Sequence, residues 1–140
     1  MFNYIWRLSI MAGTIAADIL THSTAGSLTT NYVVNGSAKA WCTWNMNSTN
    51  VVSDSFNVSS LTDNGTGINR VNFTNSMNNA VYAVTSCFYE STNLNTNVLK
   101  AGLAPVTGSV MMVGGEFQAS GTNANRDLEL AYTVIHGDLA

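Results

Sequence analysis

The chain has 140 residues, a length typical of a single domain, so we expect one hydrophobic core and no second catalytic lobe. Charged residues make up 9% of the sequence, against about 25% in ordinary globular proteins, and the formal net charge is −3. Because the five basic residues form no cluster, nucleic-acid binding is not expected as the main task. The hydrophobic share of 46% argues against disorder.

The first twenty residues are rich in apolar side chains, as a signal peptide would be. Arg7 interrupts the run and no positive side chain precedes it, so we expect neither a targeting signal nor a membrane-spanning segment. The aromatic side chains here need a surface to pack against, either the chain's own core or a neighbouring subunit. We therefore expect an N-terminal arm for assembly or anchoring at residues 1–36 and a folded domain at residues 37–140. Its candidate interface residues are Phe2, Tyr4, Trp6, Ile15, Ile19 and Leu20.

Short β-prone pieces separated by turn residues run from Thr14 to Gly36. This pattern favours an extended arm or a lead-in hairpin over a helix. From Ala38 to Met46 the residues alternate between two faces, which predicts a strand with Trp41 and Trp44 on opposite sides. One tryptophan is expected in the core and the other at an interface or a sheet edge.

The stretch from Asp54 to Phe73 has apolar residues at every second position on both sides of the sequence D-N-G-T-G. This pattern predicts a β-hairpin, with Phe56 in its first strand. Asn64 and Gly65 suit the positive-φ positions of a tight turn, and Gly67 offers a further left-handed position.

Residues 80–90 are apolar on both faces, as in a central strand, and residues 91–99 form a polar connection with a short edge strand. The glycine pair at 114–115 indicates a bulge or a close backbone approach, and residues 120–125 form a turn cluster. Residues 128–136 alternate as a final strand. Short strands between Asn, Gly and Thr turns, without helical periodicity, predict an all-β antiparallel β-sandwich or jelly roll.

No nucleophile elbow, phosphate-binding loop, paired-histidine metal motif or calcium loop is found in the sequence. His22 and His136 are single histidines in strand patterns, which are more often structural than catalytic. Glycoside hydrolysis by two carboxylates depends on the distance between the two carboxyl groups, which cannot be read from the sequence. The acidic candidates lie at strand ends or turns: Asp54, Asp63, Glu90, Glu116, Asp127, Glu129 and Asp138. We therefore expect no catalytic residue, cofactor or metal site.

Cys42 and Cys87 lie in different predicted strands and match no zinc or redox spacing. Free cysteines are commonly core residues, so buried free thiols are favoured over a disulfide.

Three strings carry a family resemblance: A-K-A-W at 38–41, D-S-F-N-V-S-S-L-T-D-N-G-T-G at 54–67 and V-N-F-T at 71–74. They resemble a family of small tail-fibre and virion structural proteins of tailed bacteriophages, especially cyanobacterial and marine ones. The lead-in I-A-A-D-I-L-T-H-S-T-A-G-S-L-T and the terminal G-D-L-A look like that family's ends. The chain departs from the pattern at W-C-T-W-N-M-N, where the family usually has a valine and a glycine-containing turn, and in its aromatic residues 1–10.

The resemblance implies a virion component that is assembled in the bacterial cytoplasm as a homotrimer and contacts other virion proteins. A tail fibre or fibre tip that touches host cell-surface glycan is the leading hypothesis. A capsid decoration protein is the alternative, and a glycan-active enzyme is a third hypothesis from a different class. Neither nucleic-acid binding nor membrane insertion is expected in any of them.

Overall fold

The computed structural model describes residues 16–24, 26–47, 50–91, 96–103, 105–117 and 123–140. The chain divides into two units, and the division lies between Val34 and Asn35. The first unit contains the hairpin of β1 (Ile19–His22) and β2 (Gly26–Thr29), and the helix α1 (Thr30–Gly36) runs across the division.

The lead-in hairpin predicted for this region is present, but the extended conformation predicted up to Gly36 is wrong because α1 follows β2 directly. A helix of seven residues makes only about two turns, too few for a 3.6-residue period to appear in the sequence. Gly36 ends the helix, as glycine commonly does.

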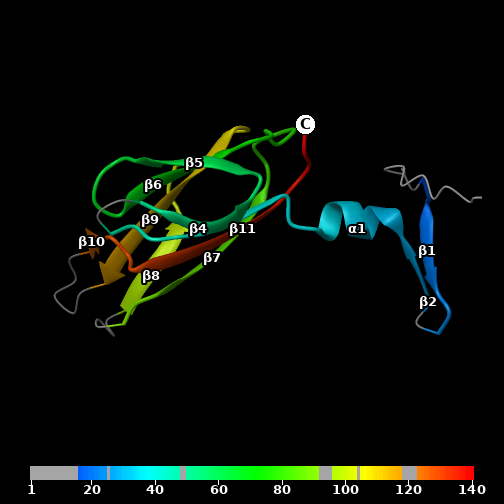
Figure 1. Cartoon of the computed structure of the whole chain (residues 1–140), viewed down its shortest axis with the longest axis horizontal. Coiled ribbons are helices and arrows are strands. Elements are labelled where there is room, and N and C mark those ends of the chain that lie inside the picture. Colours follow the sequence, from blue (N-terminus) through cyan, green and yellow to red (C-terminus); the bar gives the residue numbers. More distant parts are fainter. Residues whose placement is uncertain (1–15, 25, 48–49, 92–95, 104, 118–122) are drawn as a thin grey trace, which may run out of the picture. The chain divides into compact units, whose positions relative to one another are not determined.

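The second unit is an antiparallel β-sandwich of two sheets, and Figure 1 shows the two layers stacked. This confirms the predicted all-β sandwich. The four-stranded sheet has the order β4 (Val52–Phe56), β3 (Ala40–Trp44), β11 (Leu130–His136), β7 (Ala83–Tyr89). The other sheet comprises β5 (Val58–Asp63), β6 (Ile68–Phe73), β8 (Thr96–Ala101), β9 (Ser109–Phe117) and β10 (Asn123–Asn125).

Strand β9 is the centre of the five-stranded sheet. Its residues 112–113 pair with both β6 and β8, so these two strands lie on opposite edges of β9. Its residues 115–117 pair with both β8 and β10, so β10 lies on the same edge as β6. Strand β8 is the edge strand expected within residues 91–99, and it extends to Ala101.

The core lies between the two sheets, where every second residue of β3 and β6 is buried. Trp44 is fully buried and is the largest side chain of the core, whereas Trp41 is partly exposed on the outer face of an interior strand. The prediction of one core tryptophan is confirmed, but Trp41 does not lie at a sheet edge. The buried hydrophobic residues are Ala40, Cys42, Trp44, Met46, Val71, Phe73, Met77, Leu99, Val110, Met112, Leu128, Ala131 and Ile135.

The predicted hairpin is confirmed as β5 and β6, but Phe56 belongs to β4 in the other sheet. The cause is Asn57, whose φ of 55° turns the chain from one sheet to the other. Its side-chain nitrogen donates to the carbonyl of Lys39 at 3.0 Å, and its side-chain oxygen accepts from the amide of Asn75 at 2.7 Å. These hydrogen bonds hold the corner, and asparagine tolerates the left-handed region better than most residues.

In the β5–β6 turn, Gly65 has a φ of 109° and Gly67 a φ of 67°, as predicted, but Asn64 has no positive φ. A Cβ atom on Gly67 would lie 2.6 Å from the backbone nitrogen of Arg126, so this position also needs glycine for space. A Cβ on Gly114 would lie 2.6 Å from the carbonyl oxygen of Arg126, which confirms the predicted close backbone approach.

The predicted strands at residues 80–90 and 128–136 are both present, but the first was expected to be central, and for the second the alternation did not indicate which face is buried. Strand β7 is an edge strand rather than a central one, because among the described strands it pairs only with β11. In β11 the residues Ala131, Thr133 and Ile135 face the core, whereas Tyr132 and Val134 face outward. Apolarity alone therefore did not indicate which face of these strands is buried.

Candidate functional site

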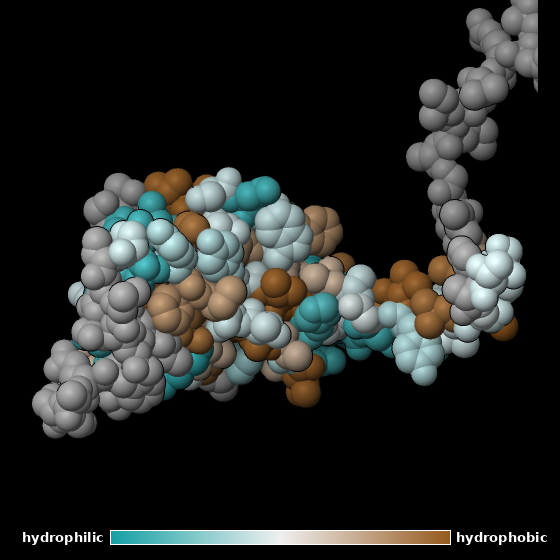
Figure 2. Space-filling view, turned by 90° about the horizontal axis from the view of Figure 1, so that it is seen from below, coloured by the Kyte–Doolittle hydropathy of each residue, from teal (hydrophilic) through white to brown (hydrophobic). Residues whose placement is uncertain are grey.

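The first unit presents apolar side chains that no described residue covers. Every described side chain of β2 is exposed, and α1 buries none of its residues. Figure 2 shows apolar residues, in brown, on the surface. The exposed large hydrophobic residues of this unit are Ile19, Leu20, Leu28, Tyr32, Val33 and Val34.

The β1–β2 register places the two leucines of the hairpin on one face. Leu20 lies directly opposite Leu28, and they are 43% and 44% exposed. The other face carries Ile19 beside Thr21 and Ser27, and the hydroxyls of Thr21 and Ser27 are 3.1 Å apart. An isolated two-stranded hairpin is at best marginally stable in water, and so is a seven-residue helix. The arm therefore depends on further contacts, and its leucine pair is the surface suited to them.

Two of the six interface residues predicted from the sequence lie in the described part of the chain. Ile19, which is 55% exposed, and Leu20 lie in β1 of this uncovered arm. Leu28 was missed because its cross-strand partner is fixed only by the register of the hairpin. Phe2, Tyr4, Trp6 and Ile15 lie outside the described residues.

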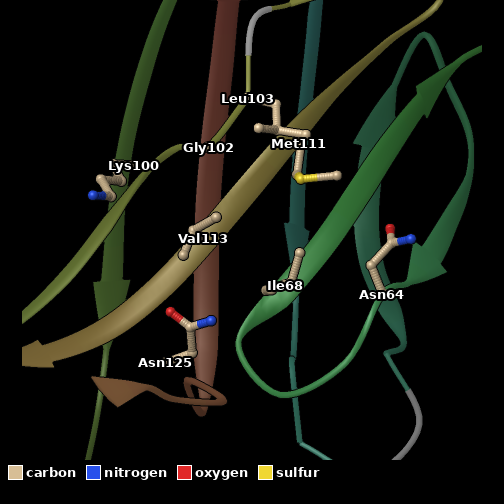
Figure 3. A pocket seen from close by; sticks show the side chains of 8 residues that line it. All are labelled: Asn64, Ile68, Lys100, Gly102, Leu103, Met111, Val113 and Asn125. Carbon is tan, nitrogen blue, oxygen red and sulfur yellow. The ribbon is translucent and has the colours of Figure 1, made fainter. Parts of the chain in front are cut away.

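A second candidate site is a hollow on the outer face of the five-stranded sheet, with a volume of about 520 Å³. Figure 3 shows Met111 and Val113 of β9 beside Ile68 of β6, which form its apolar floor. Asn64, from the β5–β6 turn, and Asn125, at the end of β10, contribute carboxamides at its margin. The remaining lining residues are Lys100, Gly102 and Leu103.

The chemistry of this hollow is that of binding rather than proton transfer. Among the described residues that line it, Lys100 alone is ionisable, and Figure 3 shows its ammonium pointing away from the other labelled side chains. The carboxamides of Asn64 and Asn125 each offer donors and an acceptor. Gly102 is required at its position, because a Cβ there would lie 2.5 Å from a methyl group of Val113. The sequence pattern did not predict this site, because it combines residues from four strands, the β5–β6 turn and the chain after β8.

The acidic candidates are spread over the sandwich, and the closest grouping serves packing. Arg126 bridges two carboxylates, with nitrogen–oxygen distances of 3.5 Å to Glu90 and 3.4 Å to Glu116. Glu90 also accepts a hydrogen bond from the amide of Glu129 at 2.8 Å, and Asp127 accepts one from the amide of Gly67 at 2.6 Å. These contacts tie β7, β9 and the chain before β11 together at one end of the sandwich.

Glu129 itself accepts a hydrogen bond from the amide of Ser91 at 2.7 Å. This contact with Ser91 lowers the pKa of the Glu129 carboxyl below its ordinary value. The other acidic candidates are separate from this grouping: Asp54 lies in β4, Asp63 ends β5 and Asp138 follows β11.

The cysteine prediction is confirmed in part. Both thiols are free, but only Cys42 is buried, and Cys87 is exposed on the outer face of β7. Burial raises the pKa of Cys42 to about 12, so its thiol stays protonated at physiological pH. His136 lies on the outer face of β11 in the sandwich, and His22 ends β1 of the first unit.

Within the described ranges, no group of three or more His, Cys, Asp or Glu side chains is placed to hold a metal ion. In the same part of the chain, no helix is long and apolar enough to cross a membrane. Comparison of the chain with protein-family models, curated proteins and solved structures gave no match.

Proposed function

We propose that this chain is the subunit of a bacteriophage tail fibre or fibre tip, in which the N-terminal arm joins three copies and the sandwich faces the host. The observation that carries the proposal is the arm itself. It is ordered as a hairpin and a short helix, yet its leucines, valines and Tyr32 are left exposed. Exposed apolar surface of this kind marks a protein–protein contact.

The sandwich supports the same role. Asn, Ser and Thr, rather than ions, dominate its polar residues, and the chain carries few charges of either sign. Such a domain can be displayed at high local concentration without strong repulsion between copies. The strings that resemble phage tail-fibre proteins lie at the start of β3, in the β4–β5 corner and in the β5–β6 hairpin, which are scaffold elements.

The first experiment measures the mass of the full chain in solution by light scattering after size-exclusion chromatography. We expect three times the chain mass for the natural sequence, and a monomer for the double substitution Leu20→Ser with Leu28→Ser. Val81→Ser is the matched control, because Val81 is 89% exposed but lies in the sandwich, and it should leave the trimer intact. A natural chain that is monomeric at all concentrations would contradict the assembly role.

The second experiment locates the chain on the particle. Antibodies against the sandwich should label phage tails in electron micrographs, with few copies per particle by quantitative mass spectrometry. Labelling over the whole head, with one copy at each repeat of the coat lattice, would instead indicate a decoration protein and would overturn the fibre assignment.

A further inference from the structure

The outer face of the four-stranded sheet carries one aromatic side chain on each of its strands. We call this set the aromatic stripe: Phe56 on β4, Trp41 on β3, Tyr132 on β11 and Tyr89 on β7. Each alternates along its strand with residues that are more deeply buried, so all four rings lie on the face opposite the core.

The strand registers arrange these residues in a line. Phe56 lies directly opposite Trp41. Tyr132 is two positions away from the residue opposite Trp41, and Tyr89 is two positions away, in the same direction, from the residue opposite Tyr132. Diagonal neighbours of this kind are about 7–8 Å apart. The line therefore crosses the sheet obliquely from one edge strand to the other, over roughly 20 Å at ordinary strand spacings.

The rings of the stripe are available to a ligand. Its two ends, Phe56 and Tyr89, are 53% and 52% exposed, and the two middle rings are partly exposed. Among the described residues, the one ring pair is formed by Phe73 and Tyr82, which are not part of the stripe. Within the same residues, no hydrogen bond engages the indole N–H or the two tyrosine hydroxyls of the stripe. Polar groups at the ends of apolar rings are therefore left to pair with something else.

The charge of this face limits what can bind there. The four strands contain one carboxylate, Asp54, and neither lysine nor arginine. The polar neighbours of the stripe, such as Thr43 and Thr85, are neutral. An acidic polymer would meet Asp54 and, in these strands, no basic side chain other than His136, whereas a neutral ligand would meet no electrostatic penalty.

We propose that the aromatic stripe binds a linear, neutral oligosaccharide that lies obliquely across the sheet. The inference rests on the proposed fibre function, for which the stripe supplies the contact with the host surface. The C–H faces of pyranose rings are apolar and stack on aromatic rings, while sugar hydroxyls pair with the indole N–H and the tyrosine hydroxyls. Trp41 and Tyr132 are the central stacking residues, and Phe56 and Tyr89 contact the outer sugar units.

A second copy of the chain fits the stripe less well. Interfaces between proteins place their aromatic anchors in a central cluster that a rim shields from water. The stripe is instead a line that ends at both edge strands, β4 and β7, so its ends are open. A polymer longer than the sheet can lie along such a line and continue past both edge strands. A cluster enclosed by a rim would not allow this.

The test is an NMR titration of the full chain with maltohexaose, cellohexaose and laminarihexaose, which are linear neutral hexasaccharides, and with hexagalacturonic acid. We expect at least one neutral hexasaccharide to shift the ring resonances of Trp41 and Tyr132 together. The corresponding trisaccharide should bind more weakly, because it spans fewer rings. The acidic hexasaccharide should bind more weakly than the best neutral one.

Substitutions then assign the binding to the stripe. Trp41→Ala and Tyr132→Ala should each weaken binding about fivefold, the effect of losing one ring contact. Tyr132→Phe keeps the ring and should retain most of the affinity. Val81→Ser should change nothing, because it is an exposed apolar residue outside the stripe. Thermal unfolding of each variant shows whether the sandwich remains folded.

Three results would overturn the proposal: no ring shift with any neutral hexasaccharide, shifts that persist unchanged in the Trp41→Ala, Tyr132→Ala double variant, or a loss of trimer mass in that variant. The last result would make the stripe a contact between copies. If no sugar binds, the fibre function can still be judged separately from the antibody labelling of tails and from the loss of the trimer in the Leu20→Ser, Leu28→Ser variant. Sugar binding by a chain that is absent from tails would support the stripe and refute the fibre.

Discussion

The arm and the sandwich differ in what covers their apolar side chains. In the sandwich two sheets bury each other's inner faces, and Trp44, Val71 and Ile135 are fully inaccessible. In the arm a single hairpin and a seven-residue helix have no second layer among the described residues, so Leu20 and Leu28 remain exposed. The same kinds of residue therefore stabilise a fold in one unit and offer a contact in the other.

The largest expected effect is the loss of a core side chain. Trp44→Ala removes the largest buried residue and should lower the free energy of unfolding of the sandwich by about 3–5 kcal/mol. Leu28→Ala, in the arm, should change the unfolding of the sandwich by less than about 0.5 kcal/mol, as exposed substitutions do. Urea denaturation followed by circular dichroism measures both.

The comparison needs a protein concentration at which association does not contribute, because binding between copies stabilises the folded state by mass action. Measurements on a dilution series provide this control. If Leu28→Ala destabilised the sandwich as much as Trp44→Ala at the lowest concentration, the arm would belong to the core of the sandwich, and the contrast between the units would fail.

The sequence predicted those parts of the sandwich that depend on local pattern. Alternation located β3, the β5–β6 hairpin and β11, and turn chemistry located the left-handed glycines at 65 and 67. The corner at Asn57 was missed, because an asparagine between two apolar residues looks like a continued strand until its side-chain partners are known. That one residue decides that Phe56 belongs to the other sheet.

The candidate sites were less predictable than the fold. Ile19 and Leu20 were predicted as interface residues because apolar side chains of the N-terminal stretch need a surface to pack against, and the structure leaves both exposed. The aromatic stripe and the hollow beside Met111 depend on the register of strands that are distant in sequence. Alternation within one strand gives two faces but does not tell which is buried, as β11 shows by turning Tyr132 outward and Ala131 inward.

A smaller effect tests how completely the interior of the sandwich is apolar. Asn69 in β6 is fully buried, and neither its side-chain oxygen nor its nitrogen has a hydrogen-bond partner among the residues that the structure describes. A buried polar group without a partner costs about 1–3 kcal/mol, so Asn69→Leu should raise the free energy of unfolding by about 1 kcal/mol after some loss to tighter packing. Denaturant midpoints of the two proteins provide the measurement.

The matched control is Asn72→Leu in the same strand, because Asn72 faces outward and donates hydrogen bonds to Ser60 and Thr62 at 3.1 and 2.9 Å. This substitution loses both bonds and should not stabilise the protein. A destabilised Asn69→Leu variant would mean that the side-chain amide of Asn69 stabilises the core, so that the interior of the sandwich is not stabilised by apolar side chains alone.

The smallest effect is the pH dependence of stability that arises from the hydrogen bond between Ser91 and Glu129. Hydrogen bonding to Ser91 lowers the pKa of Glu129 below its ordinary value of 4.5. A carboxyl whose pKa is lower in the folded state stabilises that state above its unfolded pKa, and this contribution is lost as the pH falls through the folded pKa. Glu129→Gln keeps a hydrogen-bond acceptor but cannot titrate, so its midpoint should fall below that of the natural protein at pH 7, and the difference should be smaller at pH 3. Thermal melts at pH 7 and pH 3 measure the difference between the two unfolding midpoints.

Equal differences at pH 7 and pH 3 would mean that the contact with Ser91 does not depend on charge, and that neutral hydrogen bonds stabilise this end of the sandwich.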